Sequence, residues 1–485
     1  MPDDLGIRAV RGVAWLGSGQ VIRQILAFVT NIVLARMLFP DDFGLFGMAF
    51  AATEIAQILT DFGLGAALIQ SRESKPIALT TCFWLNLALG LIVCVLLIAI
   101  APLIAEFFRR PEITWILVPL ALNMVVAASM VVPQALLTQQ LKFREMTMAQ
   151  TIGSIVASIG SISLAMNGAG VWALVLQPVI GNICNCALMY FQARWLPRGR
   201  PKISAVRHML VFSGQLLGNN LLSCIGRNLH AAILGRQIGS SALGMYNLAS
   251  GMTGTIVFQV SSVIVRVLFP TLSSLRDQPE RLAAAWLKAC AAIAIIAFPA
   301  MFGMIAVAPD LVPVVFGEQW RPAIPVLRIL CAVMAFQSVL TTSGTVLMAL
   351  GRADLLLRTS FVSIGSIALG LWLGAGYGLE AAATGYALGA IGSSLLVTYL
   401  ACQETGVRFR HLAKELLPWG LSSFVMALGV IGLAYLLVDA LPGLRLAVCV
   451  FCGAAAYVFV LLLVAPERTR GLFHDVFSRL SARRQ

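Results

Sequence analysis

The feature that most constrains this chain is a series of apolar runs, each long enough to cross a lipid bilayer. A hydrocarbon core about 30 Å thick needs roughly 20 helical residues. In lipid the backbone must satisfy its own hydrogen bonds, so each run predicts a helix. The expected fold is an all-α integral membrane protein with about fourteen transmembrane helices. The runs cover approximately residues 13–38, 43–69, 78–104, 113–138, 147–166, 170–192, 208–235, 243–270, 283–308, 322–349, 356–375, 379–401, 415–438 and 443–465.

Positive charge is distributed unevenly between these runs. The formal net charge is +13, and lysines and arginines gather in alternate connections, above all in 193–207, 402–414 and 466–485. Connections that stay in the cytoplasm carry an excess of lysine and arginine. We therefore expect a multi-pass protein of the cell (inner) membrane with both termini in the cytoplasm. This placement accounts for the basic composition without nucleic acid as a partner.

The chain also repeats itself. The triplet Leu34-Ala35-Arg36 and the following Gly44 recur 200 positions later as Leu234-Gly235-Arg236 and Gly244. Transporters use such parallel repeats to build two lobes around a midplane site. We expect two six-helix lobes in a pseudo-twofold repeat plus two C-terminal helices. The divisions are an N-lobe at 1–192, a cytoplasmic basic linker at 193–207, a C-lobe at 208–401, a cytoplasmic basic loop at 402–414, two further spans at 415–465 and a cytoplasmic tail at 466–485.

Polar stripes mark the first two runs of each half. An ionisable residue at mid-bilayer costs about 2.5–3.5 kcal/mol, so it should face a partner or a wet cavity. Residues spaced by three or four positions share one helix face. The expected cavity is lined by Gln20, Gln24, Asn31, Gln57, Asn219, Asn220, His230 and Gln259. The simpler alternative is that these groups only form hydrogen bonds between helices.

The cations on these stripes outnumber the carboxylates. Arg23, Arg227 and Arg266 stand against Glu54 and Asp61. An excess of guanidinium suits a phosphate-bearing substrate, which arginine binds in bidentate fashion. A simpler interpretation is that Arg23 neutralises Glu54.

Catalytic motifs find no support in the sequence. It contains no phosphate-binding glycine loop, no His-Glu-x-x-His and no Gly-x-Ser-x-Gly elbow. The connections between runs are also too short to fold into a separate catalytic domain. We expect a transporter without cofactor or metal, driven by an ion gradient, the membrane potential or consumption of its cargo.

Several segments resemble a known family. The stretch 34–70, from Leu-Ala-Arg-Met-Leu-Phe-Pro-Asp-Asp-Phe-Gly-Leu-Phe to Asp-Phe-Gly-Leu-Gly-Ala-Ala-Leu-Ile-Gln, resembles the opening of polysaccharide transporters, the oligosaccharide flippases of the multidrug/oligosaccharidyl-lipid/polysaccharide exporter superfamily. Further matches are Leu141-Lys142-Phe143-Arg144, Gly168-Ala169-Gly170-Val171-Trp172 and Ala349-Leu350-Gly351-Arg352. The resemblance covers nearly the whole chain.

The resemblance implies a substrate and a mechanism. The protein would move an undecaprenyl-diphosphate-linked oligosaccharide from the cytoplasmic to the periplasmic leaflet by alternating access, for exopolysaccharide, capsule or O-antigen (lipopolysaccharide) biosynthesis. The similar lipid II flippases use two six-helix lobes, a cationic cavity and two extra helices. Expected partners are the lipid-linked substrate, membrane lipids, a polysaccharide polymerase and glycosyltransferases. The coupling cation, H⁺ or Na⁺, stays open.

The residues then take hypothetical roles. Arg23 and Arg227, one per lobe, would bracket the diphosphate, and Arg266 would capture it first. Glu54 and Asp61 would neutralise the empty site or couple to a cation. One alternative is a multidrug/cation antiporter of the same superfamily, which should have a more acidic cavity. A membrane-embedded polysaccharide polymerase or ligase is the other, and it would usually need a large external loop.

Overall fold

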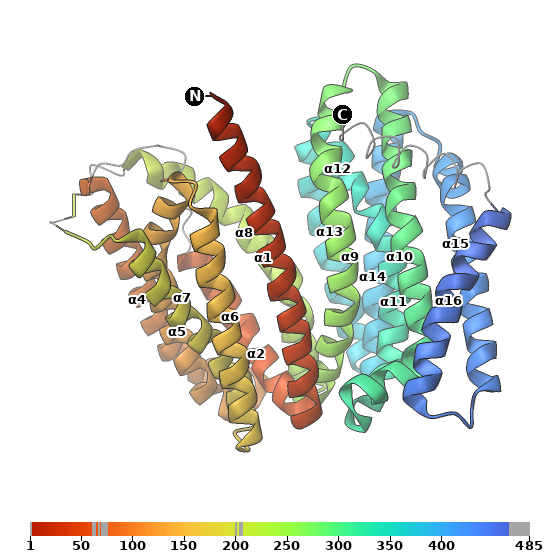
Figure 1. The fold of residues 1–485 in the computed structure, drawn as a ribbon, viewed down its shortest axis with the longest axis horizontal. Coiled ribbons are helices and arrows are strands. Elements are labelled where there is room, and N and C mark those ends of the chain that lie inside the picture. The colour runs from red at the N-terminus through yellow and green to blue at the C-terminus, as the bar shows by residue number, and fades with distance from the viewer. Residues whose placement is uncertain are drawn as a thin grey trace. The chain divides into compact units, whose positions relative to one another are not determined.

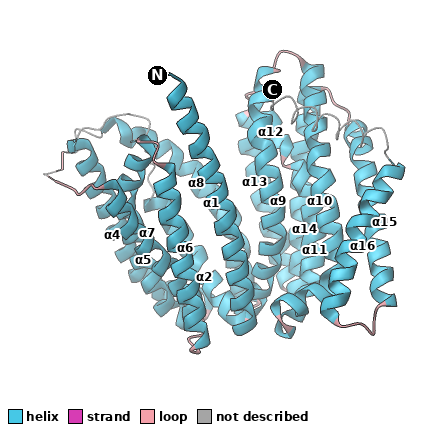
Figure 2. Cartoon of the chain, viewed as in Figure 1, coloured by secondary structure: helices cyan, strands magenta, loops and turns pink. Residues whose placement is uncertain are grey.

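The computed structural model describes residues 2–60, 65, 68, 76–198, 201–202 and 207–464. Within them it has fifteen α-helices, one 3-10 helix and no strand (Figures 1 and 2). The helices are α1 (Pro2–Met37), α2 (Pro40–Thr60), α4 (Pro76–Phe108), α5 (Glu112–Gln139), α6 (Phe143–Met166), α7 (Trp172–Ala193), α8 (Arg207–Gln237), α9 (Ser240–Ser274), α10 (Pro279–Phe316), η2 (Glu318–Ala323), α11 (Ile324–Leu340), α12 (Thr342–Ala349), α13 (Ala353–Ala375), α14 (Leu379–Thr405), α15 (Phe409–Leu436) and α16 (Pro442–Val464).

The helices correspond one for one to the expected spans. Twelve helical segments among the described residues are long and apolar enough to cross a membrane, with η2, α11 and α12 counted as one. Helices α8 and α9 have 31 and 35 residues, which at about 1.5 Å per residue exceeds the bilayer core. They bring the set to the fourteen expected helices and confirm the predicted fold class. The chain is a multi-pass membrane protein. The expected tail at 466–485 lies outside the described residues.

Proline and glycine fix several of the helix ends. Pro40, Pro76 and Pro442 each begin a helix, where the missing N–H of proline costs nothing. Helix α14 ends at Thr405 because Gly406 follows with φ 70°, a left-handed conformation that glycine adopts without steric penalty. These local signals stand in the sequence, and most expected boundaries lie within a few residues of the observed ones. Exceptions include the start of α1, at Pro2 and not at 13, and the end of α10, at Phe316 and not at 308.

The chain divides into two compact units, residues 1–244 and 245–485. In unit 1, α4 packs on α5, α6 packs on α1 and α7, and α2 packs on α8. In unit 2, α10 packs on α11 and α15, α13 packs on α14, and α15 packs on α16. The boundary therefore falls within α9, and α8 belongs to unit 1. The six-helix lobes expected from the repeat stay a prediction.

Within unit 1, the repeated glycines meet each other. A β-carbon at Gly44 would overlap the backbone of Ser240, and one at Gly244 would overlap the backbone of Pro40. The start of α2 thus lies directly against the start of α9. Arg110 joins the two ends, since its Nη2 donates to Asp41 Oδ1 at 2.9 Å and to Ser240 Oγ at 2.6 Å. The glycine that recurs in the sequence is therefore required by a backbone-to-backbone contact.

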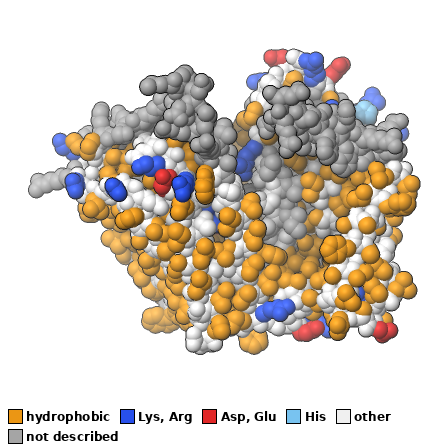
Figure 3. Space-filling model, in the orientation of Figure 1, with side chains coloured by type: hydrophobic (Ala, Val, Ile, Leu, Met, Phe, Trp, Pro, Cys, Tyr) orange, Lys and Arg blue, Asp and Glu red, His pale blue; other side chains and the backbone are white. Residues whose placement is uncertain are grey.

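The outward faces of the helices are apolar. On α4, Leu91, Ile92, Val95 and Leu96 are each more than half exposed. Figure 3 shows hydrophobic side chains across the faces of the helices, with most lysine, arginine and acidic side chains near the helix ends. In water such surfaces would be unstable, but in a bilayer they contact acyl chains.

Candidate functional site

A carboxylate of α2 and two side chains of α8 meet inside unit 1. Glu54 Oε1 lies 3.2 Å from Arg227 Nη2, and Glu54 Oε2 accepts a hydrogen bond of 2.7 Å from Asn228 Nδ2. Asn228 Nδ2 also lies 3.1 Å from the carbonyl oxygen of Cys224, one helical turn earlier. We refer to Glu54, Arg227 and Asn228 as the Glu54 cluster. It places one cation, one anion and one amide within transmembrane helices.

The exposure of the cluster shows which group is accessible. The side chain of Glu54 is 32% exposed, whereas that of Arg227 is 61% exposed. Only one nitrogen of the guanidinium contacts Glu54, so its other N–H groups have room for further acceptors. A charged group this open would be costly in lipid, and it is tolerated where it faces water or a polar ligand. Arg227 can therefore receive an anionic oxygen pair in bidentate geometry.

Arg23 lies in a different environment on α1. Its Nη2 donates to Gln20 Oε1 at 2.8 Å. Its Nη1 is buried and has no hydrogen-bond partner among the described residues. A β-carbon on Gly19 would lie 3.3 Å from this nitrogen and would overlap Thr147 of α6. Arg23 thus points partly into the contact between α1 and α6.

The structure corrects one interpretation of these charges. Glu54 is paired with Arg227, and no ion pair within the described residues joins it to Arg23. The charge that neutralises Glu54 is therefore on α8. Arg23 and Arg227 both belong to unit 1, and their expected placement in different lobes stays a prediction.

The remaining predicted residues differ in exposure. Gln24, Gln57 and His230 are half-buried, and Gln20, Asn31, Gln259 and Arg266 are exposed. Arg266 is on α9 in unit 2, and it takes part in none of the ion pairs found within the described residues. The side chains of Asn219 and Asn220 and the whole of Asp61 lie outside the described residues. Of the predicted site residues, direct contacts join Glu54 to Arg227 and Gln20 to Arg23.

Asn228 was missed by the sequence reasoning. It follows Arg227 directly, so it falls off the stripe of residues spaced by three or four positions. It reaches the same carboxylate because Glu54 offers its two oxygens to neighbouring positions of α8. An asparagine inside an apolar run was itself a signal. Among the described residues, no group of three His, Cys, Asp or Glu side chains could hold a metal ion.

Comparison with known proteins places the chain in a family. A model of the family described as polysaccharide biosynthesis protein matches residues 33–325. The chain belongs to this polysaccharide biosynthesis protein family. The lipopolysaccharide biosynthesis protein WzxC of Escherichia coli (strain K12) is 30% identical over 81% of this chain and 80% of its own length. The teichuronic acid biosynthesis protein TuaB of Bacillus subtilis (strain 168) is 28% identical over 94% of this chain and 95% of its own length.

Solved structures show which fold this polysaccharide biosynthesis protein adopts. The lipid II flippase MurJ in an inward closed conformation aligns with a TM-score of 0.72, covering 92% of this chain and 98% of MurJ at 14% identity. An inward-facing multidrug resistance transporter of the MATE family aligns with a TM-score of 0.63, covering 83% of this chain and 99% of that transporter at 14% identity. The fold is thus shared by a flippase and a drug transporter.

Proposed function

We propose that this protein is a flippase that moves an undecaprenyl-diphosphate-linked oligosaccharide from the cytoplasmic to the periplasmic leaflet of the inner membrane. The observation that carries the proposal is the exposed guanidinium of Arg227, held within membrane-spanning helices of a polysaccharide biosynthesis protein. A diphosphate is the part of such a substrate that a guanidinium binds best. The names of WzxC and TuaB support a polysaccharide precursor, and the fold shared with MurJ supports translocation of a lipid-linked one.

The Glu54 cluster suggests how the site handles its empty state. Without substrate, Glu54 balances the charge of Arg227 across 3.2 Å. An arriving diphosphate offers more charge and a better bidentate geometry than this single contact. It therefore displaces Glu54 from Arg227, while Asn228 keeps the freed carboxylate hydrogen-bonded. The exchange costs little because an ion pair exposed to this extent is worth only about 0.2–1 kcal/mol.

The other polar residues take supporting roles in this proposal. Arg23 contributes positive potential from α1, and Arg266 makes the first contact with the diphosphate. The sugar moiety would contact or be hydrated by the remaining polar groups. These are Gln20, Gln24, Asn31, Gln57, Asn219, Asn220, His230 and Gln259.

The energy source and the protein partners complete the proposal. We assign H⁺ or Na⁺ as the coupling cation, with Glu54 and Asp61 as the carboxylates that bind it once the diphosphate has displaced Glu54 from Arg227. Both termini lie in the cytoplasm in this proposal. Cytoplasmic glycosyltransferases supply the substrate. A polymerase on the periplasmic side consumes it. Alternating access of the two lobes carries the substrate from the cytoplasmic to the periplasmic leaflet.

A multidrug/cation antiporter is the second candidate function, and the fold shared with the MATE transporter favours it. A site for cationic drugs needs acidic groups free to bind them. Here Glu54 is occupied by Arg227 and Asn228. Deleting the gene separates the two functions, because loss of a flippase abolishes surface polysaccharide, whereas loss of a drug antiporter lowers resistance to cationic drugs.

Complementation of such a deletion strain tests the cationic site. We expect Arg227→Ala to reduce polymer export by at least about tenfold, because a hydrogen bond to a charged group is worth about 1.5–3 kcal/mol. Arg227→Lys should restore part of it, since lysine keeps the charge and loses the bidentate geometry. Arg23→Ala should also reduce export. Arg358→Ala, which removes an exposed cation from α13, is the matched control and should export normally.

Protein abundance in the membrane must be measured for every variant. Normal export by both Arg23→Ala and Arg227→Ala at normal abundance contradicts the assignment. If Arg358→Ala fails to the same degree, the losses reflect net charge and not the site.

A further inference from the structure

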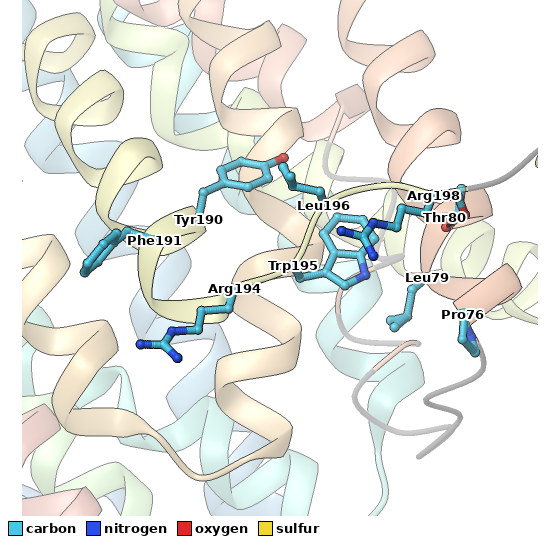
Figure 4. A pocket seen from close by; sticks show the side chains of 9 residues that line it. All are labelled: Pro76, Leu79, Thr80, Tyr190, Phe191, Arg194, Trp195, Leu196 and Arg198. Carbon is cyan, nitrogen blue, oxygen red and sulfur yellow. Dashed lines mark hydrogen bonds between the residues drawn. The ribbon is translucent and has the colours of Figure 1, made fainter.

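A separate cavity lies in unit 1, where α4 begins and α7 ends. Its volume is about 640 Å³, within the range of sites that hold small ligands. Figure 4 shows its lining side chains, which come from the start of α4, the last turn of α7 and the segment that follows α7. They are Pro76, Leu79, Thr80, Tyr190, Phe191, Arg194, Trp195, Leu196 and Arg198. None of them belongs to the Glu54 cluster.

The segment after α7 is fixed against α4 by specific contacts. Arg194 ends α7 in a left-handed conformation with φ 47°, which turns the chain away from the helix axis. The ring of Trp195 meets Phe83 edge to face, with centroids 5.8 Å apart. Thr80 Oγ1 donates to the carbonyl oxygen of Arg198 at 3.0 Å. The cavity therefore has a defined wall that carries two arginines.

Both arginines of this wall are available to a ligand. Arg194 and Arg198 are exposed, and within the described residues neither guanidinium makes a hydrogen bond or an ion pair. Between them the lining is apolar and aromatic, with Phe191 77% exposed and Leu196 63% exposed. The cavity thus combines two cations, unpaired within the part of the chain that the structure describes, with an apolar surface that reaches the outside of the helices.

We propose that this cavity binds an anionic phospholipid of the membrane. Its phosphate would lie on Arg198, Arg194 would add positive potential from the other side of Trp195 (Figure 4), and its acyl chains would run along Phe191 and Leu196. Basic pockets between transmembrane helices on the cytoplasmic side are suited to anionic head groups. Tryptophan and tyrosine, here Trp195 and Tyr190, are typical of the membrane interface. A soluble phosphate compound would gain nothing from the apolar lining, which a lipid covers.

Titration of the purified full-length protein with phosphatidylglycerol in detergent tests the proposal. Bound lipid is counted by mass spectrometry of the intact complex, with phosphatidylcholine as the zwitterionic reference. Each basic residue near anionic lipid contributes about 1 kcal/mol, so the double variant R194Q/R198Q should bind phosphatidylglycerol roughly thirtyfold more weakly. R194K/R198K should recover most of the affinity, and binding to the unmodified protein should weaken as salt is raised.

The matched control removes the same charge elsewhere. Arg408 and Arg410 are exposed and lie outside the cavity, so R408Q/R410Q should bind phosphatidylglycerol as the unmodified protein does. Equal losses in the two double variants would show a general surface-charge effect and overturn the proposal, as would unchanged binding by R194Q/R198Q.

A competition experiment separates the two sources of lipid phosphate. Undecaprenyl diphosphate should not displace phosphatidylglycerol from the cavity at equal concentration. If it does so through Arg194 and Arg198, the cavity is a carrier-lipid site and the proposal is wrong. This result is independent of the proposed function. Export through Arg227 can fail while phosphatidylglycerol binding persists, and phosphatidylglycerol binding can fail while export persists.

Discussion

Two carboxylate–guanidinium pairs, one in each unit, have the same chemistry and opposite surroundings. In unit 2, Asp310 near the end of α10 pairs with Arg445 at the start of α16 through two contacts, of which Arg445 Nε to Asp310 Oδ2 measures 2.8 Å. In unit 1, Glu54 meets Arg227 through one nitrogen at 3.2 Å. The exposed fractions of the side chains are 8% for Asp310 and 20% for Arg445, against 32% for Glu54 and 61% for Arg227.

The difference separates a structural pair from a site that can exchange partners. Arg445 also lies 3.4 Å, by its Nη1, from the carbonyl oxygen of Val438, so all three of its nitrogens are engaged. Three of its five N–H groups are thus used within unit 2, and the pair ties α16 to α10. Within the described residues, Arg227 uses one nitrogen on Glu54 and keeps most of its N–H groups free. Removing one member of a buried pair leaves an uncompensated charge, whereas an exposed charge is stabilised by water or by substrate.

The largest expected effect follows from breaking the buried pair. Asp310→Ala leaves Arg445 without its carboxylate, and we expect a destabilisation of about 3–5 kcal/mol. The thermal midpoint of the purified protein and the yield of monodisperse material measure it. The double variant D310L/R445M removes both charges and should recover most of the stability.

The double variant is also what makes this expectation falsifiable. If D310L/R445M is as unstable as Asp310→Ala, the loss comes from packing and the pair is not the cause. If Asp310→Ala has a normal midpoint and loses export, the pair resembles the Glu54 cluster and the contrast between the two fails.

A moderate effect is expected from neutralising Glu54. Glu54→Gln keeps an oxygen that accepts the hydrogen bond of Asn228 and removes the negative charge beside Arg227. Because the exposed pair is worth about 0.2–1 kcal/mol, stability should barely change, and the affinity for undecaprenyl diphosphate should rise by about 1.5- to 5-fold. Titration of the purified protein with that lipid measures the change.

Glu380→Gln is the matched control, since it neutralises an exposed carboxylate in the first turn of α14. It should leave the affinity unchanged. Weaker binding by Glu54→Gln would mean that Glu54 holds Arg227 in position for the substrate and does not compete with it.

The sequence predicted the helices well because the bilayer imposes their length. Each span had to contain about 20 apolar residues, and proline or glycine marks several of its ends. The repeat identified Gly44 and Gly244 as equivalent positions. That they lie against Ser240 and Pro40 could not be predicted, because periodicity within a helix says nothing about which helices pack together.

The charged pairs show the same limit at the level of the site. Arg227 and Glu54 were each identified as intramembrane charges, but their pairing across 173 positions depends on the packing of α2 against α8. Asp310 and Arg445 lie near the ends of their spans, where the sequence alone predicts exposure to solvent. Their burial became visible only once α10 and α16 were placed side by side.

The smallest expected effect comes from a third pair that extends the comparison to greater exposure. Arg321 lies 3.2 Å from Glu318 three residues earlier, and the two side chains are 68% and 72% exposed. Such a pair contributes at most about 0.5 kcal/mol, so Arg321→Ala should shift the thermal midpoint by no more than about 1–2 °C and leave export normal. Glu318→Ala should behave in the same way, because neither charge depends on the other for solvation. A drop of many degrees in either variant would mean that exposure does not predict how much each pair contributes to stability. Exposure could then no longer distinguish Arg227 from Arg445.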